Sequence, residues 1–192
     1  RIRLGSVEPV IITDEFLKKS DSYKINFEVN SDKDTPAIIL HSGGTTGTPK
    51  SILLSNGNFN ALAMQINVIF KDIEPGDPIL AILPIFHGFG LGVSIHSTLI
   101  LGMEVVMIPQ FRASEFDNLI KKYKPAIITG VPTLYEALTK NKGLANMDLS
   151  FMKHAVSGGD SLTELQLNNI NTFFKEHGAN IKLEQGYGMT ES

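Results

Sequence analysis

Short apolar runs alternate with helical patterns along most of this chain, and that alternation constrains the fold more than any other feature. The strand candidates are Ala37–His41, Ser51–Leu54, Ile79–Leu83, Val105–Ile108, Ala126–Thr129, Ala155–Ser157 and Ile181–Leu183. From residue 55 onward, segments with apolar residues at helical spacing separate these runs. Alternating short strands and helices predict an α/β fold with a mainly parallel sheet and helices on both faces.

The helical segments have recognisable beginnings. The expected N-terminal caps are Ser55 or Asn56, Ser114 with Asp117, and Ser161 with Glu164 as a capping box. In parallel sheets ligands bind beyond the carboxyl ends of the strands. Glycine-rich segments follow several of the predicted strands, so we expect a binding site at that edge.

One charge-free stretch, Ile79 to Met103, is longer than the roughly 20 residues that a membrane-spanning helix needs. It contains Pro84, Gly88, Gly90 and Gly92, which interrupt a helix. Strands of a parallel sheet are covered on both faces and read as continuous apolar runs. We therefore interpret the stretch as a buried strand, a turn and a helix, and expect no transmembrane segment.

The composition is that of a globular protein and excludes several functions. A formal net charge of −3 gives no electrostatic signature of nucleic-acid binding. The absence of cysteine excludes disulfides, thiolate catalysis and cysteine-ligated metals.

The strongest local signal is the glycine- and threonine-rich segment Ser42–Lys50 between two predicted strands. Glycines let backbone N–H groups turn toward an anion, hydroxyl groups add donors, and the lysine adds a positive charge. These are the groups that a polyphosphate needs, although a plain surface hairpin is the alternative.

A Walker-type phosphate loop does not fit this segment. Counting from Gly44 puts Pro49 where the second glycine belongs, and proline has no N–H to offer a phosphate. The residues that follow, Ser51–Leu54, have the pattern of a strand, whereas a Walker loop opens a helix.

Ser42–Lys50 instead resembles the phosphate loop of the adenylate-forming superfamily, which includes acyl-CoA synthetases, luciferases and adenylation domains of peptide synthetases. Gly43 occupies a position that is Ser or Thr in the family pattern, and Ser51 stands where Gly is usual. The first departure removes a hydroxyl group, and the second lies outside the phosphate contacts.

Two further segments resemble family motifs in the expected order. Leu83–Gly90 is similar to the segment that lines the acyl pocket. His87 alone would more often be a structural imidazole at a strand end, but the surrounding Pro84, Phe86 and glycines favour the pocket role. Gln185–Ser192 is a near-complete match to the adenine and magnesium motif. Ser157–Leu162 looks like the turn that meets the adenine, with Asp160 where Ala is common. That carboxylate either contacts the adenine amino group or caps the next helix.

The resemblance implies a role for each matching residue. The implied phosphate-binding residues are Ser42, Gly43, Gly44, Thr45, Thr46, Gly47, Thr48 and Lys50. The implied adenine-binding residues are Gly158, Gly159, Asp160, Gly186, Tyr187 and Gly188, and the implied acyl pocket contains His87, Gly88, Phe89, Gly130 and Val131. An ordinary helix start explains Gly130 and Val131 equally well. The implied catalytic residues are Lys50, Thr190, Glu191 and His87, with Glu191 as the Mg²⁺ ligand.

The implied function is ATP-dependent activation of a carboxylic acid to an acyl-adenylate, followed by thioester formation with CoA. The implied cofactors are ATP, Mg²⁺ and CoA, and the partners are these molecules and a fatty or aryl acid. The alternatives are an amino-acid adenylation domain, which usually carries an Asp in its pocket, and a nucleotide-binding module without catalysis. We expect a cytoplasmic location, with peripheral membrane association as an alternative.

The domain boundaries suggest a segment of a longer protein. The chain opens without methionine and stops directly after the magnesium motif. We expect residues 1–36 to end a preceding subdomain and linker, and residues 37–192 to form a truncated AMP-binding subdomain of the large N-terminal domain. Family members also carry a ribose-binding Asp, a hinge and a C-terminal domain with a catalytic Lys, which these 192 residues lack, so we expect the segment alone to be inactive.

Overall fold

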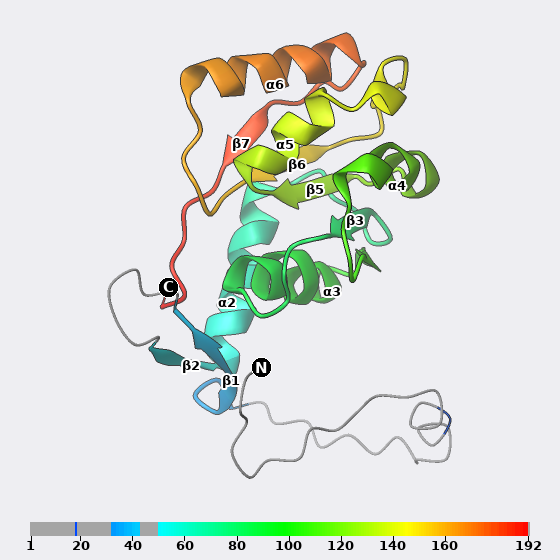
Figure 1. Ribbon diagram of the computed structural model, residues 1–192. Coiled ribbons are helices and arrows are strands. Elements are labelled where there is room, and N and C mark those ends of the chain that lie inside the picture. The colour runs from blue at the N-terminus through cyan, green and yellow to red at the C-terminus, as the bar shows by residue number, and fades with distance from the viewer. Residues whose placement is uncertain (1–17, 19–31, 43–49, 192) are drawn as a thin grey trace. The chain divides into compact units, whose positions relative to one another are not determined.

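The computed structural model describes residue 18, residues 32–42 and residues 50–191 (Figure 1). The chain divides into two units, Arg1–Ser31 and Asp32–Ser192, and every element named below belongs to the second.

Five strands form a parallel sheet, as the alternating pattern predicts. They are β3 (Pro78–Ala81), β4 (Glu104–Met107), β5 (Ile127–Gly130), β6 (His154–Ser157) and β7 (Leu183–Gln185). Their order in the sheet is β4-β3-β5-β6-β7, and each neighbouring pair is parallel. The sequence-based expectation of an α/β fold is therefore confirmed.

Helices cover both faces of this sheet (Figure 1). Neighbouring strand residues point to opposite faces, so Ile128 and Leu80 join one buried cluster while Ile127 and Ile79 join another. The first cluster packs beneath α4 (Phe116–Tyr123), α5 (Pro132–Thr139) and α6 (Glu164–Glu176), and the second beneath α2 (Asn56–Ile69), η1 (Phe89–Ser97) and α3 (Thr98–Ile100).

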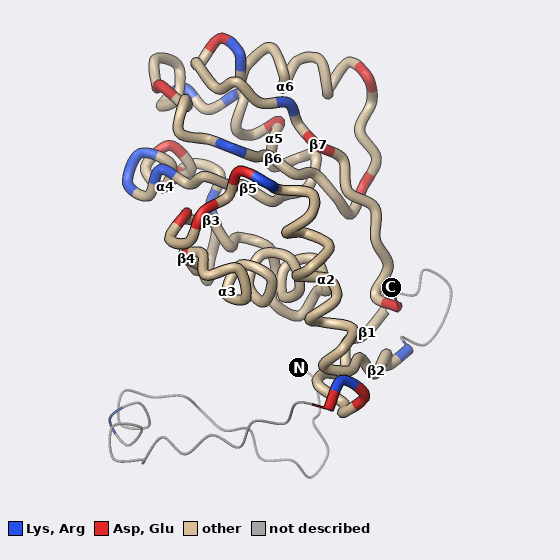
Figure 2. Tube along the Cα trace, turned by 180° about the vertical axis from the view of Figure 1, so that it is seen from behind, with Lys and Arg blue, Asp and Glu red and all other residues tan. Residues whose placement is uncertain are grey.

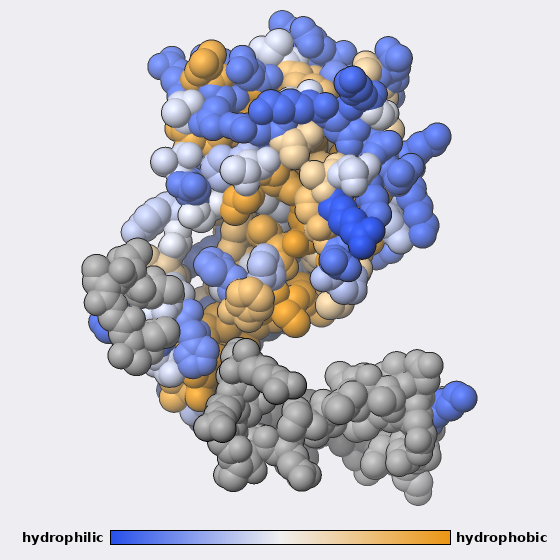
Figure 3. All heavy atoms as spheres, in the orientation of Figure 1, coloured by the Kyte–Doolittle hydropathy of each residue, from blue (hydrophilic) through white to orange (hydrophobic). Residues whose placement is uncertain are grey.

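The two helical layers differ in charge. Helix α2, η1 and α3 contain no charged residue, whereas α4 and α6 carry lysines and acids on their outer faces (Figure 2). Large apolar side chains are exposed on α2 and α3, among them Met64, Val68 and Leu99. Apolar surface is correspondingly visible over this part of the molecule in Figure 3.

A separate antiparallel hairpin precedes the parallel sheet. It consists of β1 (Pro36–His41) and β2 (Ser51–Ser55), with His41 opposite Ser51 in the register. The two strands predicted around the glycine- and threonine-rich segment are therefore present. Ser55 then caps α2, and its side chain forms a capping box with Asn58.

The charge-free stretch folds as the sequence predicts, with an unusual helix. After β3 and a turn, η1 is a π-helix, whose wider turns are rare and are often found at functional sites. The hydroxyl groups of Ser97 and Thr98 donate to carbonyl oxygens within this segment, at 2.7 Å to Gly92 and 3.0 Å to Ser94. Within the described ranges, no helix is long and apolar enough to cross a membrane.

Three local predictions were wrong. Helix α6 is capped by Thr163 with Gln166, not by Ser161 with Glu164, because the turn after β6 uses the residues up to Leu162. A 3₁₀ turn, Ala113–Glu115, comes before α4, so Ser114 does not cap that helix. Strand β7 begins at Leu183 rather than at residue 181. The backbone N–H of Leu183 donates to Oδ1 of Asn171.

Candidate functional site

The turns that follow β5, β6 and β7 lie side by side at the carboxyl edge of the sheet. The backbone N–H of Gly158 donates to the carbonyl oxygen of Gly130 at 3.0 Å, and that of Gly186 donates to the carbonyl oxygen of Ser157 at 2.7 Å. These bonds extend the parallel pairing beyond the strand ends. Residues assigned from sequence to an acyl pocket and to adenine binding therefore lie at one edge.

Close packing explains why glycines occupy the turn after β6. A Cβ atom added to Gly158 would lie 3.1 Å from Cε1 of Phe89 and 3.2 Å from the carbonyl oxygen of Gly186. Gly159 has a φ of +79°, which a side-chain-bearing residue rarely adopts, and its Cβ position lies 3.6 Å from Cγ1 of Val131. The turn thus presents bare backbone between two candidate pocket residues.

His87 shapes the turn after β3. Its Nδ1 accepts a hydrogen bond from the backbone N–H of Phe89 at 3.2 Å. The backbone N–H of His87 donates to the carbonyl oxygen of Pro84 at 3.1 Å. The neutral ring therefore carries its proton on Nε2. The side chain is exposed, and the neighbouring Gly88 packs near Leu40 of β1, with 3.7 Å between its Cβ position and Leu40 Cδ1.

The hairpin holds the two ends of the candidate phosphate loop together. The backbone N–H of Ser42 donates to the carbonyl oxygen of Lys50 at 2.9 Å, and the side chains of His41 and Ser51 lie 3.3 Å apart. Lys50 is exposed. The loop residues Gly43, Gly44, Thr45, Thr46, Gly47 and Thr48 lie outside the described residues.

The tail that follows β7 carries the adenine and magnesium motif. In both Figures 1 and 2 it runs from the parallel sheet to the β1–β2 hairpin. Tyr187 is 91% exposed, Gly188 and Glu191 are exposed, and Thr190 is half-buried. The tail thus leads from the glycine turns toward the hairpin that carries Lys50.

Asp160 is the one charged residue predicted for adenine binding. It follows the two glycines of the turn after β6, and its carboxylate is exposed. Oδ1 accepts a hydrogen bond from the backbone N–H of Ser161 at 2.7 Å.

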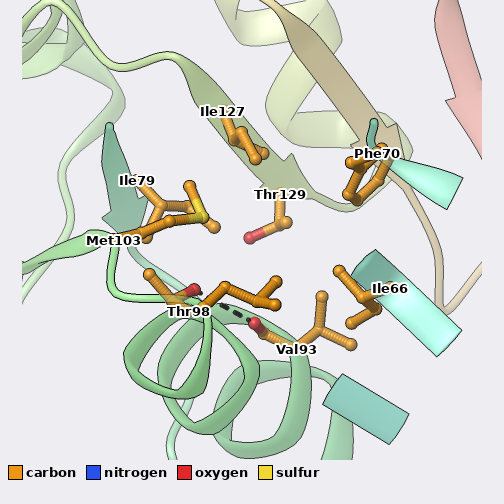
Figure 4. A pocket seen from close by; sticks show the side chains of 9 residues that line it. Ile66, Phe70, Ile79, Val93, Thr98, Met103, Ile127 and Thr129 are labelled. Carbon is orange, nitrogen blue, oxygen red and sulfur yellow. Dashed lines mark hydrogen bonds between the residues drawn. The ribbon is translucent and has the colours of Figure 1, made fainter. Parts of the chain in front are cut away.

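Sequence reasoning missed a buried hydroxyl pair next to the site. Ser94 Oγ of η1 and Thr129 Oγ1 of β5 lie 2.8 Å apart, and both residues are fully buried. Thr129 directly precedes Gly130, and a polar residue within a buried strand was the available signal. Thr129 also lines a cavity of about 10 Å³ between the sheet and the α2–η1 layer (Figure 4). A cavity of that size holds a single water molecule at most.

The described residues contain no group of three or more histidines, cysteines or acids that could hold a metal ion. A single exposed carboxylate such as Glu191 nevertheless suits Mg²⁺ bound with a nucleotide, because Mg²⁺ takes one or two carboxylates together with phosphate oxygens and water. The donor set therefore fits a metal that arrives with its nucleotide.

The chain is an α/β protein with a parallel sheet. In such folds ligands bind at the carboxyl edge of the sheet, where the glycine turns of this chain lie. The chain belongs to the AMP-binding enzyme family, whose sequence pattern matches residues 3–192.

Two curated relatives share about a third of their aligned residues with this chain. A long-chain-fatty-acid–CoA ligase of Bacillus subtilis is 34% identical over 158 residues, which cover 81% of this chain and 27% of that protein. A 4-coumarate–CoA ligase-like protein of Arabidopsis thaliana is 34% identical over 166 residues, covering 83% and 28%. The chain thus spans little more than a quarter of each relative.

A solved structure shows the same fold. ATP-bound MatB from Rhodopseudomonas palustris matches with a TM-score of 0.78 at 24% identity, over 92% of this chain and 34% of that one.

Proposed function

We propose that the protein containing this chain activates a carboxylic acid with ATP to an acyl-adenylate and then transfers the acyl group to CoA. Membership of the AMP-binding enzyme family and the two CoA-ligase relatives support this proposal. The structural observation that carries it is the meeting of the glycine turns after β5, β6 and β7 at one edge of the sheet. The tail from that edge leads to the hairpin with Lys50 (Figure 1).

The first step joins the acid to AMP. A carboxylate oxygen of the acid forms a bond to the α-phosphorus of ATP, and the bond from that phosphorus to pyrophosphate breaks. Lys50 and the donors of the phosphate loop neutralise charge on the departing pyrophosphate, while Thr190 donates to an α-phosphate oxygen. Glu191 would hold Mg²⁺, which supplies further neutralisation of phosphate charge. Positioning and charge stabilisation carry this step, so no side chain acts as a nucleophile.

The second step releases AMP. The thiol of CoA attacks the acyl carbon, a thioester bond forms, and the mixed anhydride bond to AMP breaks, with the thiol proton passing to solvent.

The acid would be bound beside His87, Gly88, Phe89, Gly130 and Val131. Phe89 and Val131 present apolar surface next to the glycine turn, and none of these five residues carries a carboxylate that could hold an amino group. We therefore propose a fatty or aryl acid rather than an amino acid.

A carboxylate panel on the full-length protein tests the function. We expect pyrophosphate release that depends on ATP and on a fatty or aryl acid, and thioester formation only with CoA. Amino acids as the sole substrates would indicate an amino-acid adenylation domain. No release with any acid, together with ATP binding, would indicate a nucleotide-binding module.

Two lysine variants separate a phosphate contact from a general loss of charge. Lys50→Ala should lower the rate of ATP–pyrophosphate exchange by about 10²–10³-fold, the usual effect of removing one group that stabilises developing charge. Lys71→Ala removes an exposed lysine from the turn after α2 and should leave the rate unchanged.

We also propose that the 192-residue chain alone has negligible adenylation turnover, because the family resemblance assigns a ribose-binding Asp and a catalytic Lys outside it. Robust ATP–pyrophosphate exchange by the purified chain would contradict this.

A further inference from the structure

We propose that the buried hydroxyl pair of Ser94 and Thr129 positions the wall of the acyl pocket, by fixing the π-helix η1 on strand β5. The inference rests on the proposed function and adds two positioning residues to it. Neither side chain is exposed, so neither touches a substrate. Both act through Phe89 and Gly130, which lie at the candidate acyl pocket.

The pair links η1 directly to the parallel sheet. Thr129 lies on the same face of β5 as Ile127, which is the face covered by α2 and η1. Its Oγ1 lies 2.8 Å from Oγ of Ser94, and the two residues are 35 positions apart in the sequence. Among the residues that the structure describes, no other hydrogen bond joins η1 to the five strands.

Packing of side chains does little to fix the position of η1. Its buried residues are Gly90, Gly92, Ser94 and Ser97, and all of them are small. Small residues let neighbouring elements approach closely, but they present no large side chain that resists sliding or rotation. A hydrogen bond has a narrow range of lengths, and breaking this one would leave buried hydroxyl groups without partners. The bond therefore determines where η1 lies along β5.

Each partner of the pair leads to a different part of the candidate pocket. Thr129 directly precedes Gly130, whose carbonyl oxygen accepts a hydrogen bond from the N–H of Gly158 at 3.0 Å. Phe89 is the first residue of the π-helix that contains Ser94, and its Cε1 lies 3.1 Å from the position of a Cβ atom on Gly158. A shift of η1 on β5 would therefore move the Phe89 ring relative to the glycine turn.

Stability alone does not account for a hydroxyl pair in this place. Thr129 lies among apolar side chains, with Phe70, Ile79 and Ile127 lining the same small cavity (Figure 4). Replacing both partners of a buried hydrogen bond by apolar groups of the same shape can be nearly neutral for stability. A satisfied polar pair in an apolar core instead specifies one arrangement of the elements around it. The pair therefore contributes to the position of η1 more than to the free energy of folding.

The test separates the position of η1 from stability by using single and double substitutions. Thr129→Val keeps the shape of the side chain and leaves the Ser94 hydroxyl without its partner. The double variant Ser94→Ala with Thr129→Val removes both hydroxyl groups, and Thr129→Ser keeps a hydroxyl in the same place. Ser97→Ala is the matched control, because Oγ of Ser97 is equally buried but donates within η1, to the carbonyl oxygen of Gly92 at 2.7 Å.

Full-length wild type and variants are assayed with ATP and the fatty or aryl acid that the wild type activates fastest, and thermal unfolding is measured for each. We expect Thr129→Val to lower the Tm by about 2–4 °C and to raise the KM for the acid about 10-fold, with the KM for ATP unchanged. The double variant should recover the Tm but keep the raised KM for the acid. Thr129→Ser should restore the KM, and Ser97→Ala should lower the Tm without changing either KM.

The inference and the proposed function fail differently. A wild-type KM for the acid in the double variant, or a KM raised as far in Ser97→Ala as in Thr129→Val, would show that the pair serves stability alone. Either result overturns the inference and leaves the proposed function intact. If Thr129→Val does not fold, the double variant and Ser97→Ala decide the question. Absence of ATP-dependent turnover with any acid in the wild type overturns the proposed function and the inference with it.

Discussion

The imidazole of His154 lies between two carboxylates, with its Nε2 2.6 Å from Oδ1 of Asp72 and its Nδ1 2.9 Å from Oε1 of Glu184. Both contacts are satisfied together when each ring nitrogen carries a proton. His154 begins β6, Asp72 lies in the turn after α2, and Glu184 lies in β7. One ring thus ties three segments together at the edge of the sheet opposite the candidate site.

This contact predicts how Asp72 contributes to stability at low pH. The hydrogen bond from His154 lowers the pKa of Asp72 below its ordinary value of 3.8. A lowered folded-state pKa means that the unfolded chain binds the proton first as the pH falls. The stabilisation is therefore fully present above the ordinary pKa and is lost as the pH falls through the lowered one.

Asp72→Asn should remove that dependence. As the pH falls from about 4 to about 2, where such carboxylates take up protons, we expect the free energy of unfolding of this variant to fall less steeply than that of the wild type. Urea unfolding at a series of pH values measures this. Asp34→Asn, which removes the charge of an exposed acid, is the control, and identical acid limbs for Asp72→Asn and wild type would contradict the prediction.

A neighbouring ion pair should contribute more to stability than a surface pair. Lys153 Nζ lies 2.7 Å from Asp77 Oδ2, and the two side chains are only 28% and 17% exposed. Asp77 also accepts a hydrogen bond from the backbone N–H of Glu74 at 2.7 Å. The hydrogen bond between Lys153 and Asp77 raises the pKa of Lys153. Asp77→Ala removes both hydrogen bonds and leaves the ammonium without this partner.

We expect Asp77→Ala to lower the free energy of unfolding by about 2 kcal/mol. Lys33→Ala breaks an ion pair whose side chains are 78% and 77% exposed, and it should cost about 0.5 kcal/mol or less. Chemical denaturation measures both. Equal effects of the two substitutions would show that burial of the Lys153 pair adds nothing.

The fold was largely predictable because period and composition are local signals. The hairpin and the strands β3 to β6 lie close to where the apolar runs placed them, since buried strands need such runs whatever their neighbours, while β7 begins two residues later than its run. The start of α6 was not predictable in the same way. Ser161 with Glu164 and Thr163 with Gln166 both match the capping-box pattern, and only the length of the turn after β6 decides between them.

Part of the candidate site followed from topology alone. The rule that ligands bind at the carboxyl ends of parallel strands anticipated that Gly130, Gly158 and Gly186 would lie together. The contact of Phe89 with Gly158 was beyond sequence reasoning, because it depends on the geometry of a π-helix that no periodic signal indicates. The Ser94–Thr129 pair was missed for the same reason, since the two residues are neighbours only across the sheet and the helix.

The π-helix should tolerate no side chain at its second residue. A Cβ atom on Gly90 would lie 2.2 Å from the carbonyl oxygen of Pro84, and backbone atoms cannot move aside as a flexible side chain can. Gly90→Ala should therefore lower the free energy of unfolding by about 2 kcal/mol or more. Gly188 has no neighbouring atom within 4 Å of its Cβ position, so Gly188→Ala should be close to neutral. Thermal unfolding compares the two, and a neutral Gly90→Ala would mean that the turn at Pro84 shifts freely.

The buried hydroxyl of Tyr135 joins two central strands and should make alkaline stability depend on one group. Its O–H is shared between two carbonyl oxygens, that of Ile128 in β5 at 2.7 Å and that of Val156 in β6 at 3.0 Å. Both carbonyls lie just before their strands end at the candidate site. Tyr135→Phe should cost about 1–2 kcal/mol, because two buried carbonyl oxygens lose their shared donor.

Burial raises the pKa of Tyr135 above its ordinary value of 10.0, so the folded chain keeps a proton that the unfolded chain releases. Wild-type stability should therefore decline as the pH rises above 10.0, and Tyr135→Phe should lack this part of the decline. Urea midpoints measured from about pH 8 to pH 11 on both variants, with the half-buried Tyr123→Phe as control, test the slope. Parallel alkaline limbs for wild type and Tyr135→Phe would mean that the phenol ionises equally in the folded and unfolded chains.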